Sequence, residues 1–137
     1  MTFYDEVGGH ETFARLVRGF YAGVAADPPL RDLYPEADLE PAQRRLRMFL
    51  EQYFGGPTAY SQERGHPRLR MRHAPYAVTP QQRDRWLRHM FASVEDLVAD
   101  GTLDEEHEAE LRDYLTRAAD MLVNAGFVTP PDGSSLT

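Results

Sequence analysis

The chain has 137 residues, of which 42% are hydrophobic and 27% are charged, and its formal net charge at pH 7 is −7. This size and composition predict one globular domain that encloses a hydrophobic core. The absence of cysteine excludes disulfides, thiolate metal ligands, iron–sulfur clusters and a cysteine nucleophile, and the absence of lysine excludes Schiff-base chemistry and a phosphate-binding loop that uses lysine.

Residues 10–26 are predicted to form the first long helix, which residues 27–29, DPP, should end. Its apolar side chains recur at spacings of three and four, which places them on one face: Phe13, Leu16, Val17, Phe20, Tyr21 and Val24. After a turn-rich segment, Asp38 is expected to cap a second helix that ends at residues 55–57, GGP. The apolar stripe of this second helix comprises Ala42, Leu46, Phe49, Leu50 and Tyr53.

Two further helices are expected in the second half of the chain. Thr79 and Gln82 form a capping box that begins a helix running to about residue 100. Thr102 and Glu105 form a second such pair before the last helix. Both helices carry apolar side chains at helical spacing, and no segment alternates as a β-strand would.

The sequence thus predicts an all-α fold with one domain, residues 1–127, and a disordered tail, residues 128–137. Within the domain, residues 55–78 show no lasting periodicity, and a loop of that length is normally functional. Its scattered apolar residues, such as Leu69 and Met71, have no helical partner face, so a group other than protein could cover them.

The same segment carries an unusual concentration of arginine. In RLRMRHAPY, residues 68–76, three arginines surround His73, and residues 64–88 together carry a local charge of +6. The rest of the chain then carries −13 and would oppose the approach of a long polyanion. We therefore expect a small anionic partner and no nucleic acid.

A flat apolar cofactor with anionic groups would account for both features. Haem needs apolar walls, an imidazole for its iron and cationic partners for its propionates. His73 is therefore the candidate iron ligand, and Arg72 or Arg45 is the candidate propionate partner. A solvated basic loop with an ordinary histidine is the simpler alternative, which composition alone leaves open.

Six fragments occur in uninterrupted order between residues 3 and 127: the Gly8-Gly9 pair, FYAGV at 20–24, LYPE at 33–36, RLRMFLEQYFGGP at 45–57, GHPRLRMRHAPY at 65–76 and RDRWL at 83–87. Taken together, they resemble the truncated haemoglobins of group II. The resemblance implies a two-over-two helical sandwich around haem, in which the helix that carries the proximal histidine is reduced to a turn within a long loop. That loop matches the aperiodic segment described above.

The resemblance also implies roles for individual residues. His73 matches the proximal ligand of the iron, while Tyr21, Tyr34 and Trp86 match three polar aromatic residues that stabilise a ligand on the opposite, distal face. Ala42 matches the position of the distal histidine in many other globins. The residues expected to contact haem are Arg45, Leu46, Phe49, Tyr53, Arg72, His73 and Trp86.

Tyrosine hydroxyls and the indole N–H are donors that would stabilise negative charge on dioxygen, while their rings fill apolar space. Each assignment has a structural alternative, in which the aromatic residues only fill the core and the arginines are solvated. The remaining histidines, at positions 10, 66, 89 and 107, are expected to be structural or solvated.

We therefore expect a haem b protein that reversibly binds dioxygen, nitric oxide and carbon monoxide and serves in oxygen binding or transport. The alternative is a haem enzyme that carries out nitric-oxide dioxygenation or peroxidase-type chemistry. Because the chain contains no flavin or nicotinamide domain, such turnover needs an external, unidentified reductase. A ligand sensor is disfavoured because no output module is present, and a haem-free helical interaction protein is the remaining alternative.

The sequence also predicts the environment of the protein. No apolar run is long enough to span a membrane, and the first residues, MTFYDEVGG, form no secretory signal. We therefore expect a cytoplasmic protein, with the oligomeric state, including a homodimer, left open.

Overall fold

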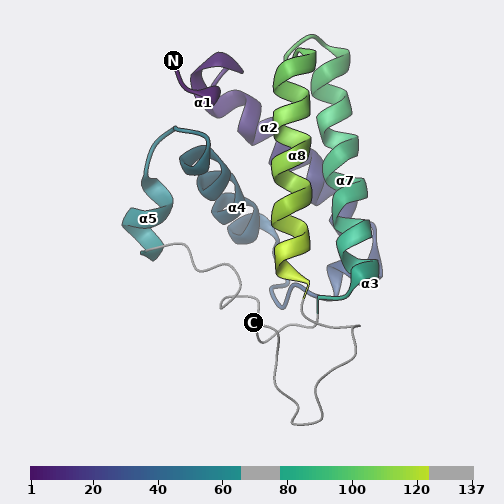
Figure 1. The fold of residues 1–137 in the computed structure, drawn as a ribbon. Helices are drawn as coiled ribbons and strands as arrows, with labels where there is room; N and C mark the ends of the chain where they lie inside the picture. Colours follow the sequence, from purple (N-terminus) through teal and green to yellow (C-terminus); the bar gives the residue numbers. More distant parts are fainter. Residues whose placement is uncertain (66–77, 124–137) are drawn as a thin grey trace.

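The computed structural model describes residues 1–65 and 78–123, and every regular element in these residues is an α-helix (Figure 1). The long helices are α2 (His10–Ala25), α4 (Glu40–Tyr53), α7 (Pro80–Ala99) and α8 (Glu105–Leu122). The short helices are α1 (Phe3–Glu6), α3 (Pro28–Arg31) and α5 (Ala59–Arg64). The predicted all-α fold class is confirmed. The predicted tail, residues 128–137, and the segment around His73 lie outside the described residues.

The long helices form two layers. Helices α7 and α8 run side by side, joined by a short turn, and α2 packs against both α4 and α7 (Figure 1). This arrangement is the two-over-two sandwich that the resemblance implies. Each large apolar side chain that it buries contributes about 1.5–3 kcal/mol of transfer free energy. The largest fully buried side chains are Phe13, Leu16, Val17, Phe20, Val24, Leu30, Met90, Val94, Leu97, Leu111 and Leu115.

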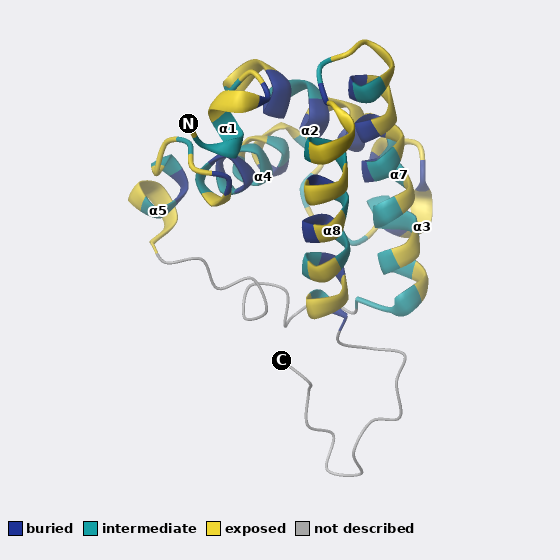
Figure 2. Cartoon of the chain, turned by 45° about the horizontal axis from the view of Figure 1, so that its top comes forward, coloured by how far each residue is buried: buried dark blue, intermediate teal, exposed yellow. Residues whose placement is uncertain are grey.

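Most buried positions of the helices follow the apolar stripes expected from the sequence, but Met48 and Glu51 of α4 are buried although they lie outside the predicted stripe. Buried positions lie on the inward sides of the long helices, and exposed positions lie on their outer sides (Figure 2). Tyr53, on the predicted stripe of α4, is 50% exposed, and Met121, near the end of α8, is 44% exposed. Both lie in the last turn of their helix.

One of the two predicted capping boxes is confirmed. The hydroxyl of Thr79 accepts a hydrogen bond from the backbone N–H of Gln82 at 3.1 Å, and the Gln82 side chain accepts one from the backbone N–H of Thr79 at 3.0 Å. These bonds satisfy N–H groups that have no partner within the helix. Pro80 lies in the first turn, where its missing N–H costs nothing.

The capping box predicted at Thr102 is wrong. Helix α8 begins after Asp104, whose side chain accepts a hydrogen bond from the backbone N–H of His107 at 2.9 Å. The hydroxyl of Thr102 instead donates to Asp100 at 2.5 Å. Because a carboxylate is a stronger acceptor than a hydroxyl, Asp104 is the better cap, and Thr102 helps to form the turn between α7 and α8.

Two further predictions need correction. The N-cap position of α4 is Leu39, although the carboxylate of Asp38 still accepts a hydrogen bond from the backbone N–H of Glu40 at 3.0 Å. The aperiodic segment at residues 55–78 contains a helix, α5. A helix of six residues is too short to reveal a period in the sequence, which explains why it was not predicted. In the described part of the chain, no helix is both long and apolar enough to cross a membrane.

Candidate functional site

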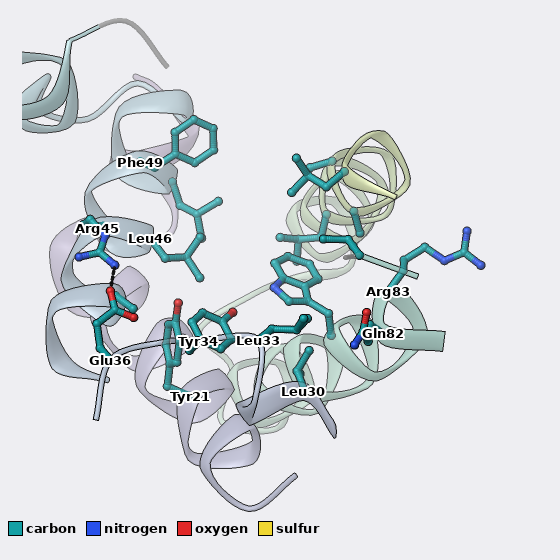
Figure 3. A pocket seen from close by; sticks show the side chains of 18 of the residues that line it. Tyr21, Leu30, Leu33, Tyr34, Glu36, Arg45, Leu46, Phe49, Gln82 and Arg83 are labelled. Carbon is teal, nitrogen blue, oxygen red and sulfur yellow. Dashed lines mark hydrogen bonds and ion pairs between the residues drawn. The ribbon is translucent and has the colours of Figure 1, made fainter. Parts of the chain in front are cut away.

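A cavity of about 290 Å³ lies between α4 on one side and α7 and α8 on the other (Figure 3). Helix α2 and the segment that follows α3 close it at the bottom of the view in Figure 3. The walls are mostly apolar and include Leu30, Leu33, Ala42, Leu46, Phe49, Leu50, Val78, Leu115, Ala118 and Leu122. The space is therefore suited to an apolar guest.

The three polar aromatic residues singled out in the sequence all line this cavity. Tyr21 comes from α2, Tyr34 from the segment after α3, and Trp86 from α7. The rings of Tyr21 and Tyr34 meet edge to face, with centroids 5.6 Å apart and planes at 73°. Figure 3 shows both hydroxyl groups directed toward the space between α4 and α7. Segments distant in sequence thus present their donor groups to one cavity.

Burial keeps both phenols protonated. It raises the pKa of Tyr21, and the neighbouring Tyr34 raises that pKa further. Burial also raises the pKa of Tyr34, although hydrogen bonding from Tyr21 and Trp86 acts in the opposite direction. An indole N–H can only donate, whereas each phenol can both donate and accept. Tyr21, Tyr34 and Trp86 thus each bring a donor group to the lining of the cavity.

Cationic side chains line the cavity from three elements: Arg45, Arg64 and Arg83. Arg45 donates to the carboxylate of Glu36 at 2.8 Å, and this hydrogen bond holds the pKa of Glu36 below its usual value. Arg83 pairs with Asp120 at 3.1 Å, and its guanidinium points away from the cavity in Figure 3. Of these two arginines, Arg45 is therefore the better placed to meet an anionic group of a guest.

These residues fit haem. The macrocycle needs facing apolar walls, which α4 supplies with Leu46 and Phe49 and α8 supplies with Leu115 and Leu122. The propionates need cations at an edge, and arginine is suited to bind carboxylates with paired hydrogen bonds. The donor groups of Tyr21, Tyr34 and Trp86, which line the cavity, suit a small ligand that gains negative charge on binding.

Other predicted site residues lie elsewhere. Tyr53 is not among the residues that line the cavity; it stacks on Tyr114, which does line it, with ring centroids 3.9 Å apart. Arg72 and His73 lie outside the described residues. Sequence reasoning overlooked Leu115 and Tyr114 as lining residues, although their positions on the apolar stripe of the last helix were a usable signal.

The described histidines are all engaged with carboxylates and none lines the cavity. His10 contacts Glu51 at 2.9 Å, and His89 contacts Asp27 at 2.8 Å. His107 contacts both Asp104, at 2.8 Å, and Glu6, at 3.1 Å. These contacts join α2 to α4, α7 to the start of α3, and α8 to α1.

Comparison with known proteins agrees with this geometry. The model of the bacterial-like globin family matches residues 2–121. The chain is 39% identical over 100 residues to the group 2 truncated haemoglobin YjbI of Bacillus subtilis, a match that covers 73% of this chain and 75% of that protein. It is also 33% identical over 122 residues to the two-on-two haemoglobin-3 of Arabidopsis thaliana, which covers 88% of this chain and 67% of that protein.

Solved structures give the same result. A thermostable haemoglobin from the actinobacterium Thermobifida fusca superposes with a TM-score of 0.88 at 58% identity, over 93% of this chain and 100% of that chain. The group II truncated haemoglobin from Bacillus anthracis superposes with a TM-score of 0.84 at 34% identity, over 91% and 98% of the two chains. The chain therefore belongs to the bacterial-like globin family as a group II truncated haemoglobin, a haem-based oxygen-binding protein.

Proposed function

We propose that this protein binds haem b in the cavity between α4 and α7 and there reversibly binds dioxygen, nitric oxide and carbon monoxide. The observation that carries the proposal is the convergence of Tyr21, Tyr34 and Trp86 on one side of an apolar cavity. When bound, haem supplies a ferrous iron to which a diatomic gas can coordinate. Oxygen transport in the cytoplasm is the proposed physiological role.

Each part of the cavity has a distinct task in holding the cofactor. His73, which matches the proximal position of the family motif, is the proposed iron ligand. Leu46, Phe49 and Trp86 supply apolar contacts to the macrocycle, and Arg45, together with Arg72, pairs with the propionates. Tyr53 supports the site indirectly, through its stacking on Tyr114.

The distal side chains favour a ligand that gains negative charge. Dioxygen draws more negative charge than carbon monoxide when it binds ferrous iron, so fixed O–H and N–H donors favour dioxygen. Tyr21, Tyr34 and Trp86 all line the cavity, and they are the proposed donors to the ligand. Ala42 is small and 5% exposed, and it leaves space where a larger side chain would crowd the ligand.

A second candidate function uses the same donors. In nitric-oxide dioxygenation and in peroxide cleavage, negative charge also develops on oxygen, and the protonated phenols of Tyr21 and Tyr34 would stabilise it. Continued turnover would require electrons from an external reductase. A homodimer is compatible with either function and is best tested by light scattering.

The visible spectrum of the purified protein tests the proposal. We expect a Soret band in the reduced protein that shifts under air and again under carbon monoxide. A colourless protein that gains no Soret band on addition of haem would remove the whole proposal. Rapid consumption of nitric oxide by the oxygenated protein would favour the dioxygenase, whereas slow consumption with reversible oxygen binding would favour transport.

A further inference from the structure

The contact between α2 and α7 contains a row of polar side chains outside the cavity. On α7, Arg85, His89 and Ser93 are spaced four residues apart, so they lie on one face of the helix. Ser93 is buried and donates a hydrogen bond to the backbone oxygen of Leu16, on α2, at 2.7 Å. Arg85 and His89 both hydrogen-bond to the carboxylate of Asp27, the residue at the N-cap position of α3.

Asp27 is the centre of this row. Its side chain is only 8% exposed, and its carboxylate hydrogen-bonds to Nη1 of Arg85 at 2.7 Å and to Nε2 of His89 at 2.8 Å. Hydrogen bonding from His89 and the charge of Arg85 hold the pKa of Asp27 below its usual value. Separating this buried carboxylate from Arg85 and His89 would leave its negative charge uncompensated, which costs free energy. The three side chains are therefore expected to stay together.

Two glycines bring α2 against this row without any intervening side chain. A Cβ atom built on Gly19 would lie 2.5 Å from Oγ of Ser93, and one on Gly23 would overlap the ring of His89. The backbone of α2 therefore lies directly against two members of the row. If α7 turned about its own axis, the side chains of His89 and Ser93 would clash with the backbone of α2. The row therefore fixes the rotational orientation of α7 relative to α2.

The direction in which the Trp86 side chain points depends on this orientation of α7. It follows Arg85 directly on α7 and leaves the helix toward the cavity, where its ring packs edge to face on the buried ring of Phe20, with centroids 5.2 Å apart. Asp27 lies in the chain between Tyr21 and Tyr34. One carboxylate thus joins the three segments that carry the cavity donors.

We infer that Asp27, with Arg85 and His89, forms a positioning cluster that sets the orientation of Trp86 relative to Tyr21 and Tyr34. None of the three residues of the cluster lines the cavity. They act through the α2–α7 contact and the α3 corner, so they are positioning residues and not ligand contacts. The inference rests on the proposed function, which makes Tyr21, Tyr34 and Trp86 the donors to the ligand.

The test uses the fact that Trp86 is the only tryptophan in the chain. In the reduced, carbon monoxide-saturated protein, one indole N–H resonance should appear in a ¹⁵N–¹H spectrum, and it reports the surroundings of Trp86 directly. We expect Asp27→Asn to shift this resonance and to speed its exchange with solvent. Oxygen release should increase by about tenfold, as for a lost hydrogen bond, with a much smaller change in carbon monoxide release.

Asp100→Asn is the matched control. Asp100 follows α7 and pairs with Arg15 of α2, so it also connects the two helices, but at the far end from Trp86. This variant should leave the indole resonance and the ratio of the two release rates unchanged. Arg85→Gln is the second test variant, because it removes one partner of Asp27. The Arg85 side chain is 36% exposed, so its replacement should not prevent folding.

The outcomes separate the inference from the proposed function. If Asp27→Asn and Arg85→Gln lower the free energy of unfolding while the indole resonance stays in place, the cluster is only structural and the inference is overturned. If the resonance moves as expected but neither these variants nor Trp86→Phe changes the ratio of release rates, the positioning role stands and the donor role of Trp86 in the proposed function fails.

Discussion

The ring of Trp86 lies edge to face against the ring of Phe20, with centroids 5.2 Å apart and planes at 61°. Phe20 is fully buried in the core, whereas Trp86 also lines the cavity. The contact anchors the indole ring from the core side, and the N–H of the indole interacts with Tyr34. A phenylalanine at position 86 would keep an aromatic contact with Phe20 and lose only the polar function.

Trp86→Phe should therefore speed oxygen release far more than carbon monoxide release. A hydrogen bond to a charged acceptor contributes about 1.5–3 kcal/mol, which corresponds to roughly a ten- to a hundredfold change in the release rate of dioxygen. Bound carbon monoxide carries less negative charge and should lose less. Stopped-flow release rates for both gases measure the difference; an equal change for both would mean that Trp86 is a steric wall and the tyrosines are the donors.

His73→Gly should remove the protein ligand of the iron. The expected result is loss of haem or a requirement for added imidazole, seen in the reduced visible spectrum. His107→Gln is a suitable control, because His107 is bonded to Asp104 and Glu6, away from the cavity. Retention of a five-coordinate ferrous spectrum in His73→Gly, together with its loss in His66→Gly, would assign the ligand to His66.

Arg45→Leu should weaken the retention of haem without a large effect on ligand release. Arg44→Leu is the control, because the two arginines are neighbours on α4 and both pair with a glutamate, but only Arg45 lines the cavity between α4 and α7. Pairing at a partly exposed position contributes about 0–1 kcal/mol, so transfer of haem to an apoglobin acceptor should speed up by no more than about fivefold. Equal transfer rates for the two variants would place Arg45 outside the propionate contacts.

Gly23→Ala should destabilise the fold even though alanine favours helices. The propensity gain in α2 is about 1 kcal/mol, but the new methyl group overlaps the ring of His89, and overpacking of this kind costs about 1–3 kcal/mol. The added loss of the contact between His89 and Asp27 should make the net effect destabilising in urea unfolding. The exposed Ala22→Ser provides the comparison, with a change below about 0.5 kcal/mol. A more stable Gly23→Ala protein would show that α2 and α7 can separate at low cost.

The stability of the protein should depend on the protonation of His107. Hydrogen bonding to Glu6 and to Asp104 raises the pKa of His107 above its usual 6.5. The folded state therefore binds this proton more tightly than the unfolded state, so the contribution is fully present below pH 6.5 and is lost as the pH rises through the raised pKa. Urea unfolding of the native protein and of His107→Gln, compared from mildly acidic to mildly alkaline pH, should show the difference between them shrinking as the pH rises. A constant difference would contradict the assignment.

The sequence by itself determined most of the helical architecture. The apolar stripe of α2 and the capping box at Thr79 and Gln82 depend on residues no more than four positions apart, so a linear sequence displays them directly. The family resemblance identified Tyr21, Tyr34 and Trp86, and the structure brings them to one cavity. The short helix α5 escaped prediction because six residues do not establish a period.

Only the tertiary structure decided how distant residues meet. Asp27 lies 58 residues before Arg85 and 62 before His89, and no local pattern predicts that one carboxylate receives both. Tyr53 lies on the predicted apolar stripe of α4 yet is half exposed, because α8 offers it the ring of Tyr114 to stack on rather than a closed core. Such contacts depend on which helix faces pack together. The packing arrangement is determined by the total apolar surface that the folded chain removes from water, and no single segment determines it.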